Sequence, residues 1–137
     1  MTNIFQDSLE SGREAARNVT ENKAQIAHVF DQLKLAIDSL TGFEGKIRIV
    51  DEYSDFLRQK PTGYLNVSYL VAEKNRATLF LFKMKQDDAG YPLIVEHKKN
   101  NVFCQNQEDL IACISRIFKD GQLILKIEHF TTEIQEQ

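Results

Sequence analysis

The sequence predicts an α+β domain in which a long N-terminal helix precedes a mainly antiparallel sheet of about five strands. Apolar residues recur at helical spacing in the first third, alternate with a period of two from Lys46 onward, and return to helical spacing after Asn106. A chain of 137 residues is long enough for one domain with a single core. We therefore expect one domain over residues 1–137, in the order helix, four strands, helix, strand.

The first helix is predicted from two series of residues spaced seven apart, which together imitate the d and a positions of a heptad repeat. One series is Phe5, Gly12, Val19, Ile26, Leu33 and Leu40, and the other is Leu9, Ala16, Lys23, Phe30 and Ile37. We call the line that they form along the helix the seam. Ser11 and Glu14 have the spacing of a capping box, so the strongest part of the helix is expected to begin at Ser11. Gly42 and Gly45 are expected to end it.

The two halves of this helix differ in how much surface they can bury. The C-terminal half is expected to pack on the sheet. Gly12 and Lys23 interrupt the seam in the N-terminal half, so residues 1–23 are predicted to project, either solvated or in a partly polar contact. A projecting half would pair with a second copy or with a partner helix. The residues predicted to bind that partner are Ala16, Val19, Lys23, Ile26 and Phe30.

Four strands are predicted between the helices from the alternation of apolar and polar residues, at Lys46–Val50, Tyr64–Ala72, Thr78–Lys85 and Tyr91–Lys98. A short helical turn is expected between the first two, at Tyr53, Phe56 and Leu57. The third strand is apolar on both faces, which predicts a central place in the sheet. Asp87–Gly90 is predicted to be a hairpin loop.

The C-terminal third is predicted to hold a helix, a last strand and a polar tail. Asn106 is expected to cap the helix, and Glu108 and Asp109 in its first turn oppose the positive end of its dipole. Leu123–Ile127 alternates and is predicted to be the final strand, reached by a right-handed crossover if it runs parallel to the fourth. The tail at 131–137 is expected to fray.

The triplet Glu96-His97-Lys98 lies at the end of the fourth predicted strand. From Tyr64 to Ile127 the predicted order of elements, with Glu-x-Lys on the third strand of the core, resembles the restriction-endonuclease-like fold. The resemblance implies a nuclease in which Glu96 and a carboxylate on the adjacent strand hold Mg²⁺ while Lys98 orients the attacking water. This nuclease, or an inactive relative of it, is the alternative function.

The predicted strand register argues against that alternative. It places Glu96 opposite Leu81 and Lys98 opposite Leu79, both apolar. Asp87 lies at the far end of the hairpin, about 17 Å away at the rise of a strand. The triplet then reads as the end of an ordinary half-buried strand.

Composition favours a cytoplasmic protein without a cofactor or a bound metal. The net charge of −3 gives no field that attracts nucleic acid or an anionic membrane. No apolar stretch approaches the roughly 20 residues that span a bilayer, and the N-terminus lacks the features of a signal peptide. Cys104 and Cys113 are expected to be reduced, half-buried thiols.

These observations predict a small non-catalytic protein-binding module, of the adaptor, immunity or chaperone type, that forms a homodimer. The acidic balance, the over-long first helix and the lack of a recognisable catalytic motif support this prediction. A third possibility is a small-molecule binder that uses a pocket between the first helix and the sheet.

Overall fold

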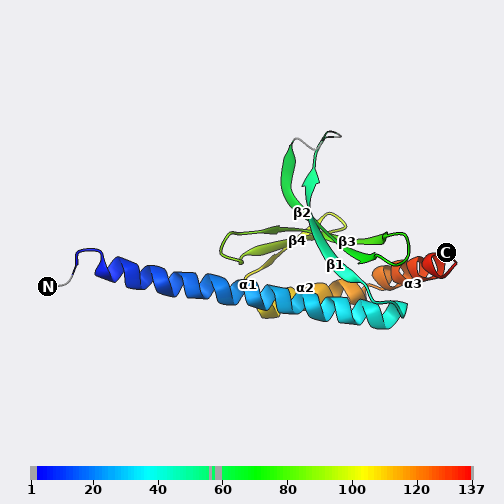
Figure 1. The fold of residues 1–137 in the computed structure, drawn as a ribbon, viewed down its shortest axis with the longest axis horizontal. Coiled ribbons are helices and arrows are strands. Elements are labelled where there is room, and N and C mark those ends of the chain that lie inside the picture. The colour runs from blue at the N-terminus through cyan, green and yellow to red at the C-terminus, as the bar shows by residue number, and fades with distance from the viewer. Residues whose placement is uncertain (1–2, 56, 58–59, 137) are drawn as a thin grey trace.

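The computed structural model describes residues 3–55, 57 and 60–136. In chain order its elements are α1 (Gln6–Thr41), β1 (Lys46–Tyr53), β2 (Pro61–Val71), β3 (Ala77–Gln86), β4 (Leu93–His97), β5 (Asn100–Cys104), α2 (Gln107–Lys119) and α3 (Gln122–Gln135). The strands form one antiparallel sheet in the order β1-β2-β3-β4-β5, and the helices lie on one side of it (Figure 1). The predicted α+β fold, with a long N-terminal helix and a five-stranded antiparallel sheet, is confirmed.

Helix α1 is longer than the capping-box spacing suggested. It begins at Gln6, so Ser11 and Glu14 lie inside it, and the prediction of a start at Ser11 is wrong. A turn at Asn3 begins the helix instead: the Asn3 side chain accepts a hydrogen bond from the Phe5 N–H at 2.8 Å. The helix ends as expected at Gly42, whose φ is 77°. Its 36 residues span about 54 Å.

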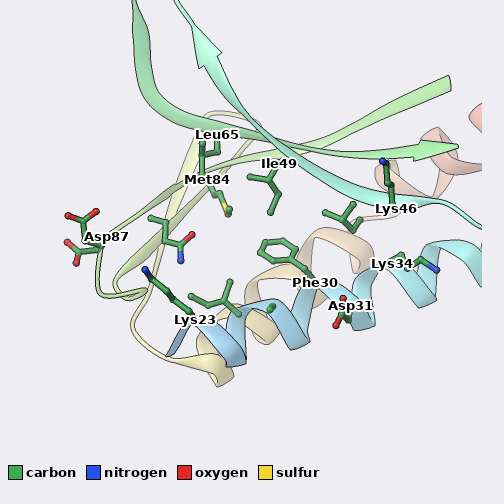
Figure 2. A pocket seen from close by; sticks show the side chains of 14 residues that line it. Lys23, Phe30, Asp31, Lys34, Lys46, Ile49, Leu65, Met84 and Asp87 are labelled. Carbon is green, nitrogen blue, oxygen red and sulfur yellow. The ribbon is translucent and has the colours of Figure 1, made fainter. Parts of the chain in front are cut away.

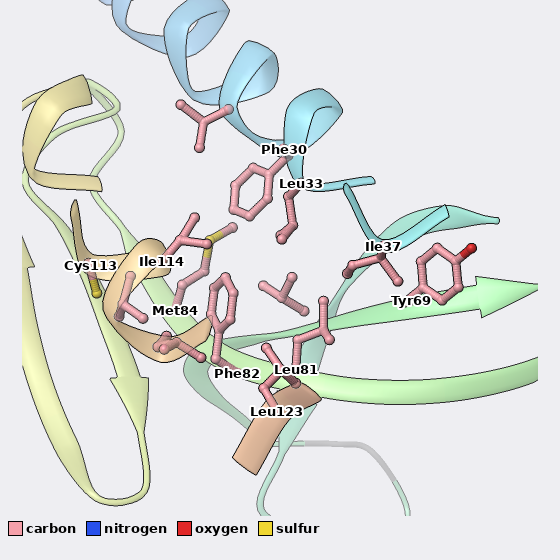
Figure 3. Packing of buried hydrophobic residues seen from close by; sticks show 14 of the residues in the cluster. Phe30, Leu33, Ile37, Tyr69, Leu81, Phe82, Met84, Cys113, Ile114 and Leu123 are labelled. Atoms are coloured by element: carbon pink, nitrogen blue, oxygen red, sulfur yellow. The ribbon is translucent and has the colours of Figure 1, made fainter. Parts of the chain in front are cut away.

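The core lies between the inner face of the sheet and the three helices (Figure 3). From α1 it receives the C-terminal part of the seam, at Ile26, Phe30, Leu33 and Ile37. The Phe30 ring stacks on Phe82 of β3, with ring centroids 6.3 Å apart. β3 is the central strand, as its apolar character on both faces predicted. The C-terminal half of α1 therefore packs on the sheet.

The end of the chain differs most from expectation. Leu123–Ile127 is not a strand but the first part of α3, so the expected crossover has no counterpart. The buried residues Leu123, Ile127, Phe130 and Ile134 follow helical spacing, whereas Leu125 is 59% exposed. The tail does not fray at 131, because Ile134 is only 1% exposed. The fifth strand is instead β5, which pairs with β4 across a two-residue turn.

The C-terminal end of β1 and the N-terminal end of β2 rise away from the helices (Figure 1). Tyr53, where a helical turn was predicted to begin, is the last residue of β1. Phe56, in the middle of that predicted turn, lies outside the described residues. The outer half of β1 is thus a strand that leaves the body.

A polar network fastens the C-terminal end of α1 to the sheet. One oxygen of the Asp38 carboxylate accepts hydrogen bonds from the Tyr69 hydroxyl at 2.6 Å and from the Gly45 N–H at 2.9 Å. The other oxygen pairs with Lys34 at 2.6 Å. Burial and the hydrogen bond to Asp38 raise the pKa of Tyr69 to about 12, so this hydroxyl remains a donor at any physiological pH.

This network predicts a loss of stability in acid. Burial raises the pKa of the Asp38 carboxyl, but hydrogen bonds from Lys34, Tyr69 and Gly45 outweigh it and lower the pKa below its ordinary value. Charged Asp38 therefore stabilises the fold above its ordinary pKa of about 4, and this contribution disappears as the pH falls through the lower, folded-state pKa. We expect Asp38→Asn to lower the free energy of unfolding at pH 7.

The measurement is urea unfolding of the wild type and of Asp38→Asn from pH 7 to pH 2.5. The difference between their free energies of unfolding should shrink below pH 4. Asp31→Asn, which removes an exposed carboxylate from the same helix, is the matched control and should follow the wild type. If the free energies of unfolding of the wild type and Asp38→Asn differ by the same amount from pH 7 to pH 2.5, charged Asp38 does not stabilise the fold as described.

Candidate protein-binding surfaces

The N-terminal part of α1 is an arm, defined here as residues 5–23, that extends beyond the sheet (Figure 1). Every residue from Asp7 to Asn18 is exposed. Contact with the body begins at Asn22, whose side-chain amide donates to the Ala89 carbonyl at 3.1 Å. Ile26 is the first buried residue of the helix. The arm thus occupies the segment that the sequence predicts to project.

The seam continues from the core into the arm without a covering element among the described residues. Phe5 is 63% exposed and Leu9 is 56% exposed. Gly12 and Ala16 follow on the same helix face, and Val19 is half-buried. Residues that would be core positions if the sheet reached further along α1 are therefore open to solvent.

The predicted partner-binding residues divide into two groups. Ala16 and Lys23 are exposed and Val19 is half-buried, so they lie on the open surface of the arm. Ile26 and Phe30 are 5% and 6% exposed and belong to the chain's own core, so they offer little surface to a helix that pairs along the arm. The predicted set thus spans the base of the arm and part of the core. Phe5 and Leu9, which it omits, are the largest exposed apolar residues of the arm.

A groove of about 780 Å³ opens beside the base of the arm, between α1 and the sheet (Figure 2). Its apolar floor comes from α1 and from three strands, and includes Ile26, Phe30, Ile47, Ile49, Leu65 and Met84. Charged side chains stand around the rim: Lys23, Asp87 and Asp88 from one side, and Asp31, Lys34 and Lys46 from the other. The groove corresponds to the pocket between first helix and sheet that the sequence raised as a third possibility.

A second hollow, of about 820 Å³, follows strand β1 toward its C-terminal end. It is lined by Arg48, Ile49, Val50, Asp51, Tyr53, Asp55, Leu65 and Asn66. Residues of both faces of β1 line this second hollow, and Ile49 and Leu65 also line the groove. Its side chains Ile49, Val50 and Tyr53 are 41%, 38% and 37% exposed.

The predicted nuclease residues do not form one site. Glu96 lies opposite Lys83 on β3, and not opposite Leu81, because the connection between the strands runs from Asp87 to Pro92 and shifts the register by two residues. On the outer face of the sheet, Lys83 forms an ion pair with Glu52. The hydrogen bond that Lys83 donates to Glu52 raises the pKa of Lys83, and the negative charge of Glu96 raises it further. The lysine thus stands where a metal would have to bind.

Lys98 lies beyond the end of β4, so the predicted strand to Lys98 is one residue too long. It occupies the two-residue turn before β5 with a φ of 52°. Its ammonium pairs with Asp120, at the end of α2, at 2.6 Å. This bond lowers the pKa of the Asp120 carboxyl. Lys98 is therefore held by a helix on the inner side of the sheet, whereas Glu96 faces outward.

No cluster of three or more His, Cys, Asp or Glu side chains in the described part of the chain could hold a metal ion. None of the described helices is long and apolar enough to cross a membrane. Cys104 and Cys113 are free thiols, and both are fully buried rather than half-buried.

Comparisons with known proteins assign no family to this chain. No family model, no curated protein and no solved structure matches it. The function must therefore be argued from the surfaces themselves.

Proposed function

We propose that the chain is a non-catalytic protein-binding module of the cytoplasm that forms a homodimer by pairing its arms, as an adaptor, immunity factor or chaperone would. The exposed seam of the arm carries the proposal. Residues 7–18 of α1 are all exposed, and a helix of that length is only marginally stable by itself in water. Gly12 costs this segment about 1 kcal/mol relative to alanine. Covering Phe5 and Leu9 would both hold the arm helical and remove apolar surface from water.

The second copy is expected to run antiparallel. From Ile26 onward the seam is occupied by the chain's own sheet. In a parallel pair the sheets of both copies would lie at the same end of the arms and compete for the same space. The two Lys23 side chains, which carry like charges, would also face each other. An antiparallel partner places the two bodies at opposite ends of the paired arms, so neither obstacle arises.

An antiparallel pair centred on Glu14 brings a positions of one copy opposite d positions of the other. Leu9 then lies opposite Val19 of the second copy. At the centre, Gly12 meets Ala16 of the second copy, and two small residues let the helices approach closely. At each end the Phe5 ring meets Lys23 of the second copy, whose stem covers the ring while its ammonium stays in water.

The extent and charge of the arms are compatible with this pairing. Residues 5–23 of each copy would be in contact over about 27 Å. Each arm carries four acidic and three basic residues, so no large net charge separates the copies. Glu96 and Lys98, by contrast, lie on different faces of the sheet and lend no support to the nuclease alternative.

The proposal is tested by sedimentation equilibrium of the wild-type protein over a range of concentrations. We expect a mass of twice the 15.8 kDa of one chain. A mass of one chain at all concentrations up to roughly 100 μM, where even a weak dimer of micromolar affinity would be complete, would overturn it.

A further inference from the structure

Strand β1 has a free edge. It is the outermost strand of the sheet, and its only strand partner among the described residues is β2. Six of its eight residues are exposed. An edge of this length leaves a row of backbone N–H and C=O groups available to another strand. Helix α1 runs below the sheet, on the side of its inner face (Figure 1).

The two hollows lie along the edge at which an added strand would pair. Ile47 and Ile49 line the groove on the inner side of β1, whereas residues of both faces of β1, among them Arg48, Ile49 and Val50, line the second hollow. Successive side chains of a strand point to opposite faces. A strand added to this edge would therefore place alternate side chains toward the apolar groove (Figure 2), and its length would follow the second hollow along β1. A compact small molecule would fill only part of this extended surface.

Every strand pair of the sheet is antiparallel, so an added strand is expected to run antiparallel to β1, and the charges along the edge then set its charge pattern. Lys46 and Arg48 lie toward the start of β1, and Asp51 and Glu52 lie toward its end. A segment that runs antiparallel places its own N-terminal end beside the acidic residues. Such a segment is matched by a basic residue near its start and an acidic residue near its end.

We propose that β1 binds an extended segment of a partner protein by strand addition. The segment runs antiparallel to β1, carries apolar residues at alternate positions facing the groove, and has a basic start and an acidic end. Main-chain hydrogen bonds supply affinity, and the groove supplies specificity. This site goes beyond the pairing of the arms and does not depend on it, since the main-chain hydrogen bonds of the β1 edge come from residues outside the arm. Lys23 alone belongs to both the arm and the rim of the groove.

The probe is a fluorescein-labelled peptide of sequence Lys-Val-Thr-Val-Thr-Val-Asp, with binding followed by fluorescence anisotropy. Two further peptides carry N-methyl groups on alternate residues, one on the odd and one on the even positions. Alternate N–H groups of a strand point to opposite edges. Strand addition therefore requires that one methylated peptide binds with the affinity of the parent peptide, while the affinity of the other is at least ten-fold lower. A scrambled peptide of the same composition should bind at least ten-fold more weakly.

Ile49→Asp places a charge at the groove and should weaken binding of the parent peptide at least ten-fold. Leu125→Asp introduces the same charge at an exposed leucine of α3, away from the edge, and should leave binding unchanged. Circular dichroism of both variants reports whether they fold. Binding that is equal for both methylated peptides, insensitive to Ile49→Asp, or absent for the parent peptide would overturn the proposal.

The experiment is run on both the wild type and an arm variant, Leu9→Asp. Peptide binding that persists in a monomeric Leu9→Asp protein would support the β1 site separately from arm pairing. If Leu9→Asp instead stays dimeric and becomes monomeric only with Ile49→Asp added, the edge belongs to a second copy. That result would overturn the proposal that β1 binds a segment of a partner protein.

Discussion

Replacing Leu9 with aspartate is expected to convert the dimer into a monomer while the body of the protein stays folded. In the proposed pairing, Leu9 packs against Val19 of the second copy, and the two-fold symmetry repeats that contact. The substitution would bury two unpaired carboxylates, at a combined cost of about 3 kcal/mol or more. That cost corresponds to a dissociation constant raised about 100-fold. The body should be unaffected because Leu9 contacts none of the buried core residues.

Asn18→Asp is the matched control for Leu9→Asp. It adds the same charge to the arm at an exposed position off the seam. Its mass by sedimentation equilibrium should remain that of the dimer, and thermal unfolding should show that both variants keep a cooperative fold. A Leu9→Asp protein that sediments like the wild type would contradict the role given to the seam.

Replacing Gly45 with alanine is expected to lower the free energy of unfolding by about 3 kcal/mol. A Cβ added at Gly45 would lie 2.4 Å from Cζ of the buried Tyr69 ring, far inside van der Waals contact. The ring would have to move, and its hydroxyl would then lose the 2.6 Å hydrogen bond to Asp38. Overpacking and a lost hydrogen bond to a carboxylate each cost about 1 to 3 kcal/mol.

Gly12→Ala is the control for this substitution, because a Cβ added at Gly12 meets no atom within 4 Å. Both changes are made in the Leu9→Asp background, so that dimer formation does not enter the comparison. Urea unfolding should show no loss for Gly12→Ala and a gain of at most about 0.5 to 1 kcal/mol, since it removes a glycine from a helix. Similar losses for both variants would contradict the close contact at Tyr69.

Local patterns predicted those parts of the fold in which one periodicity dominates. The C-terminal seam of α1, the alternation of Leu65, Val67 and Tyr69 in β2 and the Asn106 cap all appear in the structure as expected. Leu123, Leu125 and Ile127 fit a strand as well as a helix, and only Phe130 and Ile134 extend the pattern to the helical one. β5 is polar at Asn100 and Asn101, so no alternation marked it.

The candidate surfaces were predictable only in part, because they depend on where the sheet stops along α1. Phe30 and Leu9 occupy equivalent places in the heptad pattern, yet one is buried by the sheet and the other is open. The pattern therefore indicated the arm but not its limit, and the predicted set included Ile26 and Phe30, which the chain's own sheet buries. The free edge of β1 depends on the strand order, which no local signal carries.

The antiparallel pairing of the arms is tested most directly by distances between spin labels in the dimer. Cysteines introduced singly at Asp7, Glu14 and Glu21 lie on the exposed arm off the seam, and the native Cys104 and Cys113 are too buried to be labelled. Pairing centred on Glu14 predicts the shortest distance between labels at position 14. In a dimer labelled at position 7, the two labels should be about 21 Å apart along the helix axis, in addition to their separation across the pair, and the same holds for a dimer labelled at position 21. Equal distances at all three positions would mean parallel arms, and the absence of any distance between copies would mean that the arms do not pair.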